Sequence, residues 1–218
     1  MKPDVLASWV ADARAKTMDL VADLSDEQLR VPLLRIVNPF LWEIGHVAYF
    51  QEYFVLRHLL GRPPIRSDAD SLYDSAKIAH DTRWDLPLPS RRDTLDYLEA
   101  TRDRVLDLLA GPEVSPEREY FILLSLFHED MHNEAFTITR QTVGYPAPPF
   151  ERLANEAGGH VAGSVSVPGG IYTIGSTANN GFIFDNEKWA HPIDIQPFRI
   201  ARAPVTQQEF AAFVDDRG

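Results

Sequence analysis

The chain has 218 residues, 44% of them apolar, which is enough for one large or two small domains with a substantial core. Its formal net charge of −11 argues against nucleic-acid binding, which needs a basic surface, and its lack of cysteine excludes disulfides, thiolate metal sites and cysteine nucleophiles. No apolar run approaches the roughly 18 residues that span a membrane, and residues 1–16 lack a signal peptide's apolar core, so we expect a cytoplasmic protein with no membrane partner.

The first two thirds of the chain have the pattern of long helices. Apolar residues recur with helical spacing from Asp4 to Leu24, which predicts one long amphipathic helix. Ser25 and Gln28 then form a capping-box pattern, in which each side chain can bond to the other residue's backbone N–H. The chain therefore begins with a long helix followed by a short helical turn.

Three more helices are predicted from their start and stop signals. The expected N-caps are Asn38, Ser90 and Ser115, and the expected stops are Gly61, Gly111 and Gly144. Pro39 and Pro116 stand at first helical positions, where the missing N–H of proline costs nothing. Together these helices predict a four-helix bundle over residues 1–145, an architecture that often builds metal sites from side chains on facing helices.

The pattern changes in the last third of the chain. Residues 146–163 are rich in Pro, Ala and Gly and are predicted to be a linker. The segments SVSVPGGIYTIGS and HPIDIQPFRIARAPVT have the alternation of strands, and Thr206 with Glu209 predicts a capped final helix. So few elements bury too little surface to stand alone. We therefore interpret residues 164–218 as the N-terminal part of a larger α+β domain whose remainder lies outside this chain.

Three histidines carry the functional signal. They are His46 in LWEIGHVAYFQE and the pair His128 and His132 in LFHEDMHNEA. The pair is spaced i, i+4 on one predicted helix, so both imidazoles project from the same face and can reach one metal ion. His46, on another helix, would complete a facial set of three ligands and leave positions open for substrate and oxygen. The alternative, a chance pair and a core histidine bonded to a carbonyl, stays open at this point.

Other residues near these motifs are predicted to have smaller roles. Gly45, beside His46, leaves room for another group to come close. The histidines in polar or turn-like stretches, interpreted as non-ligands, are His58, His80, His160 and His191. The acids around the three candidate ligands, which are either outer partners of an imidazole or solvated, are Glu43, Glu52, Glu129, Asp130 and Glu134.

These motifs together resemble the EgtB-type family of nonheme iron enzymes. The GHVA helix and the HxxxHxE pattern resemble its DinB-like four-helix bundle. The stretch VPGGIYTIGS…FDNEKWAHPIDIQPFRIARAPVTQQEFAAFV resembles the start of its formylglycine-generating-enzyme-type (C-type-lectin-like) α+β domain. The resemblance covers nearly the whole chain. It implies Fe(II) held by His46, His128 and His132, and an O2-dependent reaction that joins sulfur or selenium to the imidazole C2 of hercynine (trimethylated histidine).

Two features depart from the ergothioneine branch of that family. Met131 stands just before the last histidine, where that branch usually has a Gln that orients the imidazole substrate. The branch also binds an anionic thiol peptide with loop arginines, for which Arg83 is the best match and Lys77 a weaker one. We therefore predict Arg83 and Met131 as substrate-binding residues and favour the selenoneine-forming branch, whose donor is a selenosugar. The resemblance implies that the catalytic residues lie mostly in the remainder of the C-terminal domain, outside this chain.

Two other functions remain open on the sequence. A DinB-like protein can be a metal-dependent thiol transferase that uses a similar histidine triad. A non-enzymatic alternative is a metal-binding stress-response module whose β part is an interaction domain. The start of a second domain argues against the transferase, because such proteins usually consist of the bundle alone.

Overall fold

The computed structural model describes residues 1–148, 150, 159–178 and 181–218. The chain divides into two compact units, Met1–Phe150 and Glu151–Gly218, each described here by itself. Half of the predicted linker, residues 149 and 151–158, lies outside the described residues. The predicted α+β class is confirmed, because long helices form the first unit and the second contains short strands.

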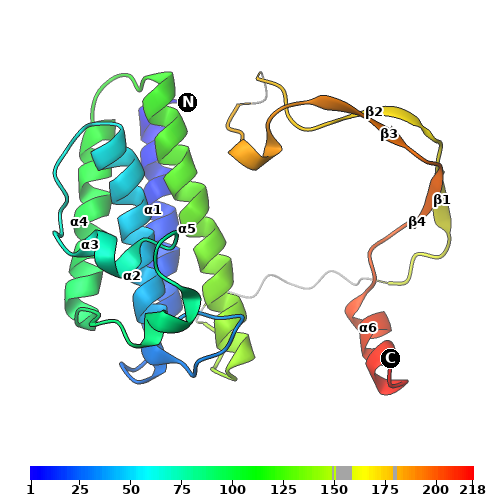
Figure 1. Ribbon diagram of the computed structural model, residues 1–218, viewed down its shortest axis with the longest axis horizontal. Coiled ribbons are helices and arrows are strands. Elements are labelled where there is room, and N and C mark those ends of the chain that lie inside the picture. Colours follow the sequence, from blue (N-terminus) through cyan, green and yellow to red (C-terminus); the bar gives the residue numbers. More distant parts are fainter. Residues whose placement is uncertain (149, 151–158, 179–180) are drawn as a thin grey trace. The chain divides into compact units, whose positions relative to one another are not determined.

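The first unit is a four-helix bundle with short helical segments between its long helices (Figure 1). Its elements are α1 (Pro3–Val21), η1 (Gln28–Arg30), α2 (Phe40–Gln51), η2 (Glu52–His58), α3 (Ala69–Tyr73), η3 (His80–Trp84), α4 (Arg91–Leu109) and α5 (Pro116–Thr142). Helices α1 and α2 each pack against both α4 and α5, which is the predicted bundle. In the described part of the chain, no helix is long and apolar enough to cross a membrane.

The predicted caps of the last two long helices are confirmed. Ser90 is the N-cap of α4, and its side chain accepts a hydrogen bond from the backbone N–H of Asp93. Ser115 is the N-cap of α5 and accepts a hydrogen bond from the N–H of Arg118 in the same way. Each cap satisfies one of the N–H groups that a helix start leaves without a partner.

The predicted cap of α2 is wrong. The N-cap is Pro39 rather than Asn38, and α2 begins at Phe40. Asn38 Oδ1 instead accepts a hydrogen bond of 2.6 Å from Arg83 Nη1 in η3. The tertiary fold therefore brings a charged donor, Arg83, to the Asn38 side chain, which the local sequence predicted to cap α2.

The ends of the first two long helices also differ from expectation. Helix α1 ends at Val21, three residues before the expected end, and α2 passes into the π-helix η2 instead of continuing as an α-helix. The stop at Gly61 is confirmed by its positive φ of 64°. The short elements α3 and η3 were not predicted, because neither has a long apolar period.

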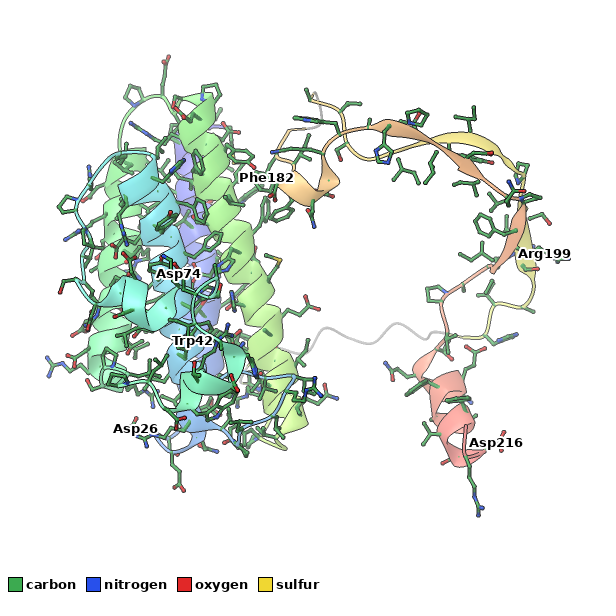
Figure 2. The ribbon with its side chains drawn as sticks, viewed as in Figure 1. Asp26, Trp42, Asp74, Phe182, Arg199 and Asp216 are labelled. Atoms are coloured by element: carbon green, nitrogen blue, oxygen red, sulfur yellow. The ribbon has the colours of Figure 1, made fainter. Side chains whose placement is uncertain are left out.

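The bundle core lies around α2. Its large apolar members that are almost completely buried are Leu20, Leu29, Phe40, Trp42, Ile44, Tyr73, Leu98 and Phe136. Trp42, labelled in Figure 2, donates its indole N–H to the carbonyl of Leu72 at 2.7 Å and so ties α2 to α3. At the same contact, a Cβ added to Gly45 would lie 2.2 Å from Tyr73 Cε1. The group that approaches Gly45 is therefore an aromatic ring of the protein.

The second unit contains two short antiparallel ladders and one helix. Its elements are β1 (Ser164–Val167), β2 (Gly170–Ile174), η4 (Asp185–Glu187), β3 (His191–Ile195), β4 (Phe198–Ala201) and α6 (Gln207–Asp215). β1 pairs with β4 and β2 pairs with β3, so the predicted strands are present. Thr206 and Glu209 form the predicted capping box of α6. Apolar side chains such as Ile171 and Phe210 remain exposed in this unit.

Candidate metal centre

Three imidazoles from two helices converge within the bundle. His46 comes from α2, and His128 and His132 come from α5. The ring centroids of His46 lie 5.0 Å from those of both His128 and His132, which are themselves 4.4 Å apart. Each ring offers one nitrogen to a group in which all ligand atoms lie within 4.8 Å of one another. The sequence-predicted triad is thus brought together, as shared metal coordination requires.

Aromatic rings on α2 restrict two of these imidazoles. Trp42, one turn before His46, stacks on it with centroids 4.9 Å apart and planes inclined by 8°. Phe50, one turn after His46, stacks on His128 at 3.6 Å with planes inclined by 5°. Because residues four apart share a helix face, one stripe of α2 supplies both a ligand candidate and the platforms around it.

Hydrogen bonds determine the tautomers of two histidines. His46 Nδ1 lies 2.8 Å from the carbonyl oxygen of Tyr73, which can only accept, so Nδ1 carries the proton. His132 Nδ1 lies 2.5 Å from Oε1 of the buried Glu43, and an ionised carboxylate also only accepts. Both Nε2 atoms therefore present lone pairs, held by the kind of outer partner that orients histidine ligands in metal sites.

The third histidine completes the set. His128 Nε2 lies 3.2 Å from His132 Nε2, and His128 Nδ1 is buried without a hydrogen-bond partner among the described residues. At this distance the two nitrogens are held together by a proton that one of them donates to the other, or by a cation that both of them bind. The donor set consequently fits a metal ion bound by three imidazole nitrogens, which suits Fe(II) and other borderline metals.

Burial keeps two of the imidazoles neutral. Desolvation, together with the neighbouring His132, lowers the pKa of His46 to about 3. Desolvation followed by the neighbouring His132 and His46 also lowers the pKa of His128 far below its ordinary value. A neutral imidazole keeps a lone pair, so neither ring needs to lose a proton to bind a metal near neutral pH.

The metal-free protein should lose stability on acidification as a result. In the unfolded chain a histidine takes up its proton near about 6.5, whereas folded His46 does so only at about 3. Between these pH values the unfolded state binds more protons, so the free energy of unfolding falls as pH falls, by up to about 1.4 kcal/mol per pH unit for each such histidine. Urea unfolding at pH 7, 6 and 5 measures this slope. The variant His128→Gln should have a shallower slope, and an unchanged slope would contradict the assignment.

The two predicted substrate residues have different surroundings. The Arg83 guanidinium lies 3.9 Å over the Trp42 ring while its Nη1 donates to Asn38, so this cation is held against the start of α2. Met131 is 52% exposed and directly precedes His132 on α5. Lys77, the weaker candidate, is exposed and paired with Asp74 at 2.7 Å. The loop cations are thus engaged by the protein, and Met131 lies at the surface next to a ligand candidate.

Among the acids and histidines with smaller predicted roles in the described part of the chain, Glu43 is the one that shares a hydrogen bond with a candidate ligand. Glu43 contacts His132, whereas Glu129 bonds to Arg14 and Glu52 bonds to Tyr97. The remaining histidines contact other groups: His58 packs on Phe54 and Phe121, His80 bonds to the carbonyl of Val37, His160 to Glu209, and His191 to the carbonyl of Trp189. Sequence reasoning missed Trp42 and Phe50, although each stands four residues from His46 and so shares its helix face.

Comparisons with known proteins place both parts of the chain in families. Residues 10–135, more than half of the chain, match the DinB superfamily. Residues 149–218 match the Sulfatase-modifying factor enzyme 1-like domain. A 56-residue segment is also 38% identical to a formylglycine-generating enzyme of Streptomyces coelicolor, covering 26% of this chain and 18% of that protein.

Longer similarities run through both parts. The chain is 33% identical over 230 residues to a hercynine oxygenase of Mycolicibacterium smegmatis, covering 99% of this chain and 51% of the relative. It is 32% identical over 222 residues to a hercynine oxygenase of Mycobacterium tuberculosis, covering 99% and 52%. The chain therefore spans about half the length of the curated relatives that it matches along both parts. With its helical domain, its second domain and their order all accounted for, the chain belongs to the DinB superfamily and, within it, to the EgtB-type family.

Proposed function

We propose that the enzyme carrying this chain is an Fe(II)- and O2-dependent oxidoreductase that forms a C–S or C–Se bond at the imidazole C2 of hercynine. The observation that carries the proposal is the convergence of three imidazoles in a DinB-superfamily bundle. The relatives named hercynine oxygenase support the substrate. We also propose residues 1–145 and 164–218 as its two domains, joined by a linker over residues 146–163.

His46, His128 and His132 are the proposed iron ligands. Three protein ligands leave coordination positions open, and iron bound there would supply the electrons that activate O2. Glu43 and the carbonyl of Tyr73 hold two of the imidazoles in the tautomer that leaves Nε2 free. The stacked rings of Trp42 and Phe50 keep the imidazoles from rotating away and cover part of the site with apolar surface.

Arg83 and Met131 are proposed substrate contacts. Arg83 Nε is buried and has no hydrogen-bond partner among the described residues, which leaves one N–H available to a bound molecule. Met131 is exposed beside His132 and offers a soft, adaptable side chain. A thioether cannot donate a hydrogen bond, so Met131 would contact a substrate through packing alone.

The proposed donor is a neutral, sugar-linked selenol, and this gives a testable preference. A dianionic thiol peptide held away from water needs compensating cations, because an unpaired buried charge is strongly unfavourable. Here Lys77 is paired with Asp74, so of the two candidate cations only Arg83, whose partners Asn38 and Trp42 carry no charge, could balance a dianion. We expect kcat/KM for the selenosugar to exceed that for γ-glutamylcysteine and for cysteine. Competition assays measure the preference, and faster turnover with γ-glutamylcysteine would assign the enzyme to sulfur chemistry.

The reaction itself is tested by product mass. The Fe(II)-loaded enzyme is incubated with hercynine and each donor under air, and O2 consumption is followed in parallel. We expect O2 uptake that depends on hercynine, and a product whose mass shows hercynine joined to the chalcogen. Thiol transfer without O2 uptake would support the transferase alternative, and metal binding without turnover would support the non-enzymatic one. Either result would refute the proposal.

Glu43→Gln should weaken metal binding without changing the ligands. The amide loses the charge that holds the His132 Nδ1–H, and removing such an outer partner typically costs about 10–100-fold in metal affinity. Anaerobic Fe(II) titration against a competing chelator measures the dissociation constant. Glu134→Gln, which changes an exposed acid two residues after His132 on α5, is the matched control and should bind iron as the wild type does. Equal affinity in the Glu43 variant would show that its carboxylate does not orient His132.

A further inference from the structure

A buried polar cluster joins α1 to the helix that carries two of the histidines. Arg14 and Thr17 of α1 face Glu129 and Asn133 of α5, and all four side chains are buried. Arg14 Nε lies 2.7 Å from Glu129 Oε1, and Nη2 lies 3.1 Å from Oε2, so the ion pair is bidentate. Thr17 Oγ1 lies 2.7 Å from Glu129 Oε1 and 2.8 Å from Asn133 Oδ1. The cluster thus holds α1 and α5 together through several hydrogen bonds, each of which requires a particular geometry.

Its α5 members are direct neighbours of the proposed ligands. Glu129 follows His128 by one residue, and Asn133 follows His132 by one residue. One residue corresponds to a rotation of about 100° around an α-helix, so the two pairs occupy adjacent faces with the same axial spacing. Any rotation or sliding of α5 that displaces Glu129 and Asn133 must therefore displace both imidazoles by a similar amount.

The same guanidinium also contacts the other ligand-bearing helix. Arg14 Nη2 donates a hydrogen bond of 3.0 Å to Oε1 of the buried Gln51 on α2, the helix that carries His46. Arg14 Nη1 donates to the carbonyl of Leu98 on α4. One side chain on α1 thus bonds to all three other helices of the bundle, including both helices whose imidazoles must meet.

We propose that Arg14 and Glu129 are positioning residues for the metal centre, because their ion pair, together with the Arg14–Gln51 hydrogen bond, sets the register of α5 against α2. The proposal rests on the proposed metal site. Metal–nitrogen bonds of about 2.0–2.1 Å leave little tolerance for a shifted helix. Apolar cores accept small rearrangements, whereas a bidentate ion pair has one favourable geometry. Replacing a buried ion pair by apolar residues often leaves stability unchanged, so the function of this pair lies in geometry.

The same helix offers a matched control pair. Arg140 of α5 is buried and forms a bidentate ion pair with Asp23, with Nη1–Oδ1 and Nη2–Oδ2 distances of 2.8 and 2.7 Å. It also donates to the carbonyl of Leu20 on α1 at 2.8 Å. Arg140 stands eight residues after His132, which is about 12 Å along a helix. This pair therefore fastens α5 to the N-terminal part of the chain at a distance from the imidazoles.

The experiment compares two charge-free double variants of the full chain. One is Arg14→Met with Glu129→Leu, and the other is Arg140→Met with Asp23→Leu. Co(II) is the probe, because its ligand-field absorption reports coordination geometry, and its dissociation constant is measured by chelator competition. Fe(II) is titrated anaerobically in parallel. Circular dichroism and urea unfolding establish that each variant is folded under the conditions of the titration.

We expect the Arg14/Glu129 variant to bind Co(II) on the order of tenfold more weakly, with a changed absorption spectrum, as after the loss of an outer-shell partner. The Arg140/Asp23 variant should keep the wild-type dissociation constant and spectrum whatever its stability. Equal binding by both variants, or equal weakening, would overturn the proposal. If the first variant does not fold, the test uses Arg14→Lys, which keeps the positive charge but cannot form the bidentate contact with Glu129. Wild-type Co(II) binding by this variant would overturn the proposal. Weaker binding with an altered spectrum would support it. Failure of the wild type to bind either metal would instead refute the metal site itself.

Discussion

His128→Ala should reduce Fe(II) affinity by at least roughly 100-fold, because loss of an outer partner alone already costs up to that much. The remaining His46 and His132 could offer only two nitrogens, and two ligands compete poorly with buffer and water for iron. The change also removes the ring on which Phe50 stacks, so the site would become open to solvent. The dissociation constant is measured by anaerobic titration against a chelator. The same loss is expected for alanine at His46 or His132.

His58→Ala is the matched control for this series. His58 lies in η2, contacts Phe54 and Phe121, and is exposed, so its removal should leave iron affinity at the wild-type value. A variant with alanine at all three proposed ligands should retain no stoichiometric iron. Stoichiometric iron in that triple variant would show that the metal is held elsewhere in the protein.

Gly45→Ala should destabilise the bundle by about 1–3 kcal/mol, the usual cost of forcing an extra carbon into a packed core. The added Cβ would lie 2.2 Å from Cε1 and 2.3 Å from Cζ of Tyr73. That ring is fully buried and stacked near Tyr97 at 6.3 Å, so it has little room to move. Helix propensity alone would make alanine more favourable than glycine by about 1 kcal/mol. The two effects therefore change the free energy of unfolding in opposite directions, and the measurement distinguishes them. Urea unfolding of the metal-free protein measures the change.

Gly111→Ala provides the comparison. No described atom lies within 4 Å of the position where its Cβ would be, so the change should alter stability by no more than about 0.5 kcal/mol. A second result is expected for Gly45→Ala. The carbonyl of Tyr73 accepts the His46 Nδ1–H, so displacing Tyr73 should also weaken iron binding. A stabilised Gly45→Ala variant would show that Tyr73 moves aside without cost.

The sequence predicted those features of the fold that depend on near neighbours. Ser90 and Ser115 cap their helices through N–H groups three residues away, so the whole interaction is contained in a short stretch of sequence. Asn38 has the same residue type and failed as a cap, because its partner is Arg83, which is 45 residues away in sequence. Local patterns therefore predict a cap correctly only where no distant charged group competes for the side chain.

In the candidate site, too, the sequence predicted the features that depend on near neighbours and missed those that depend on the fold. The pairing of His128 with His132 follows from the helical period. His46 was proposed as the third ligand because it lies on another predicted helix, and the resemblance to a family supported its inclusion. The acceptor for His46, the carbonyl of Tyr73, could not be predicted, because every residue has a carbonyl and only the fold selects one. The ion pair of Arg14 with Glu129 spans 115 residues and has no local signature in either helix.

The distribution of the three histidines also has a consequence for biosynthesis. His46 lies in the second long helix of the bundle and the other two lie in the last, so a nascent chain has only one of the three imidazoles until α5 is made. A metal ion held by the proposed triad therefore cannot serve as a template for the earlier helices, because its full set of ligands exists only once α5 has been made. Contacts of the polypeptide alone therefore have to guide the packing of the helices that are made before α5.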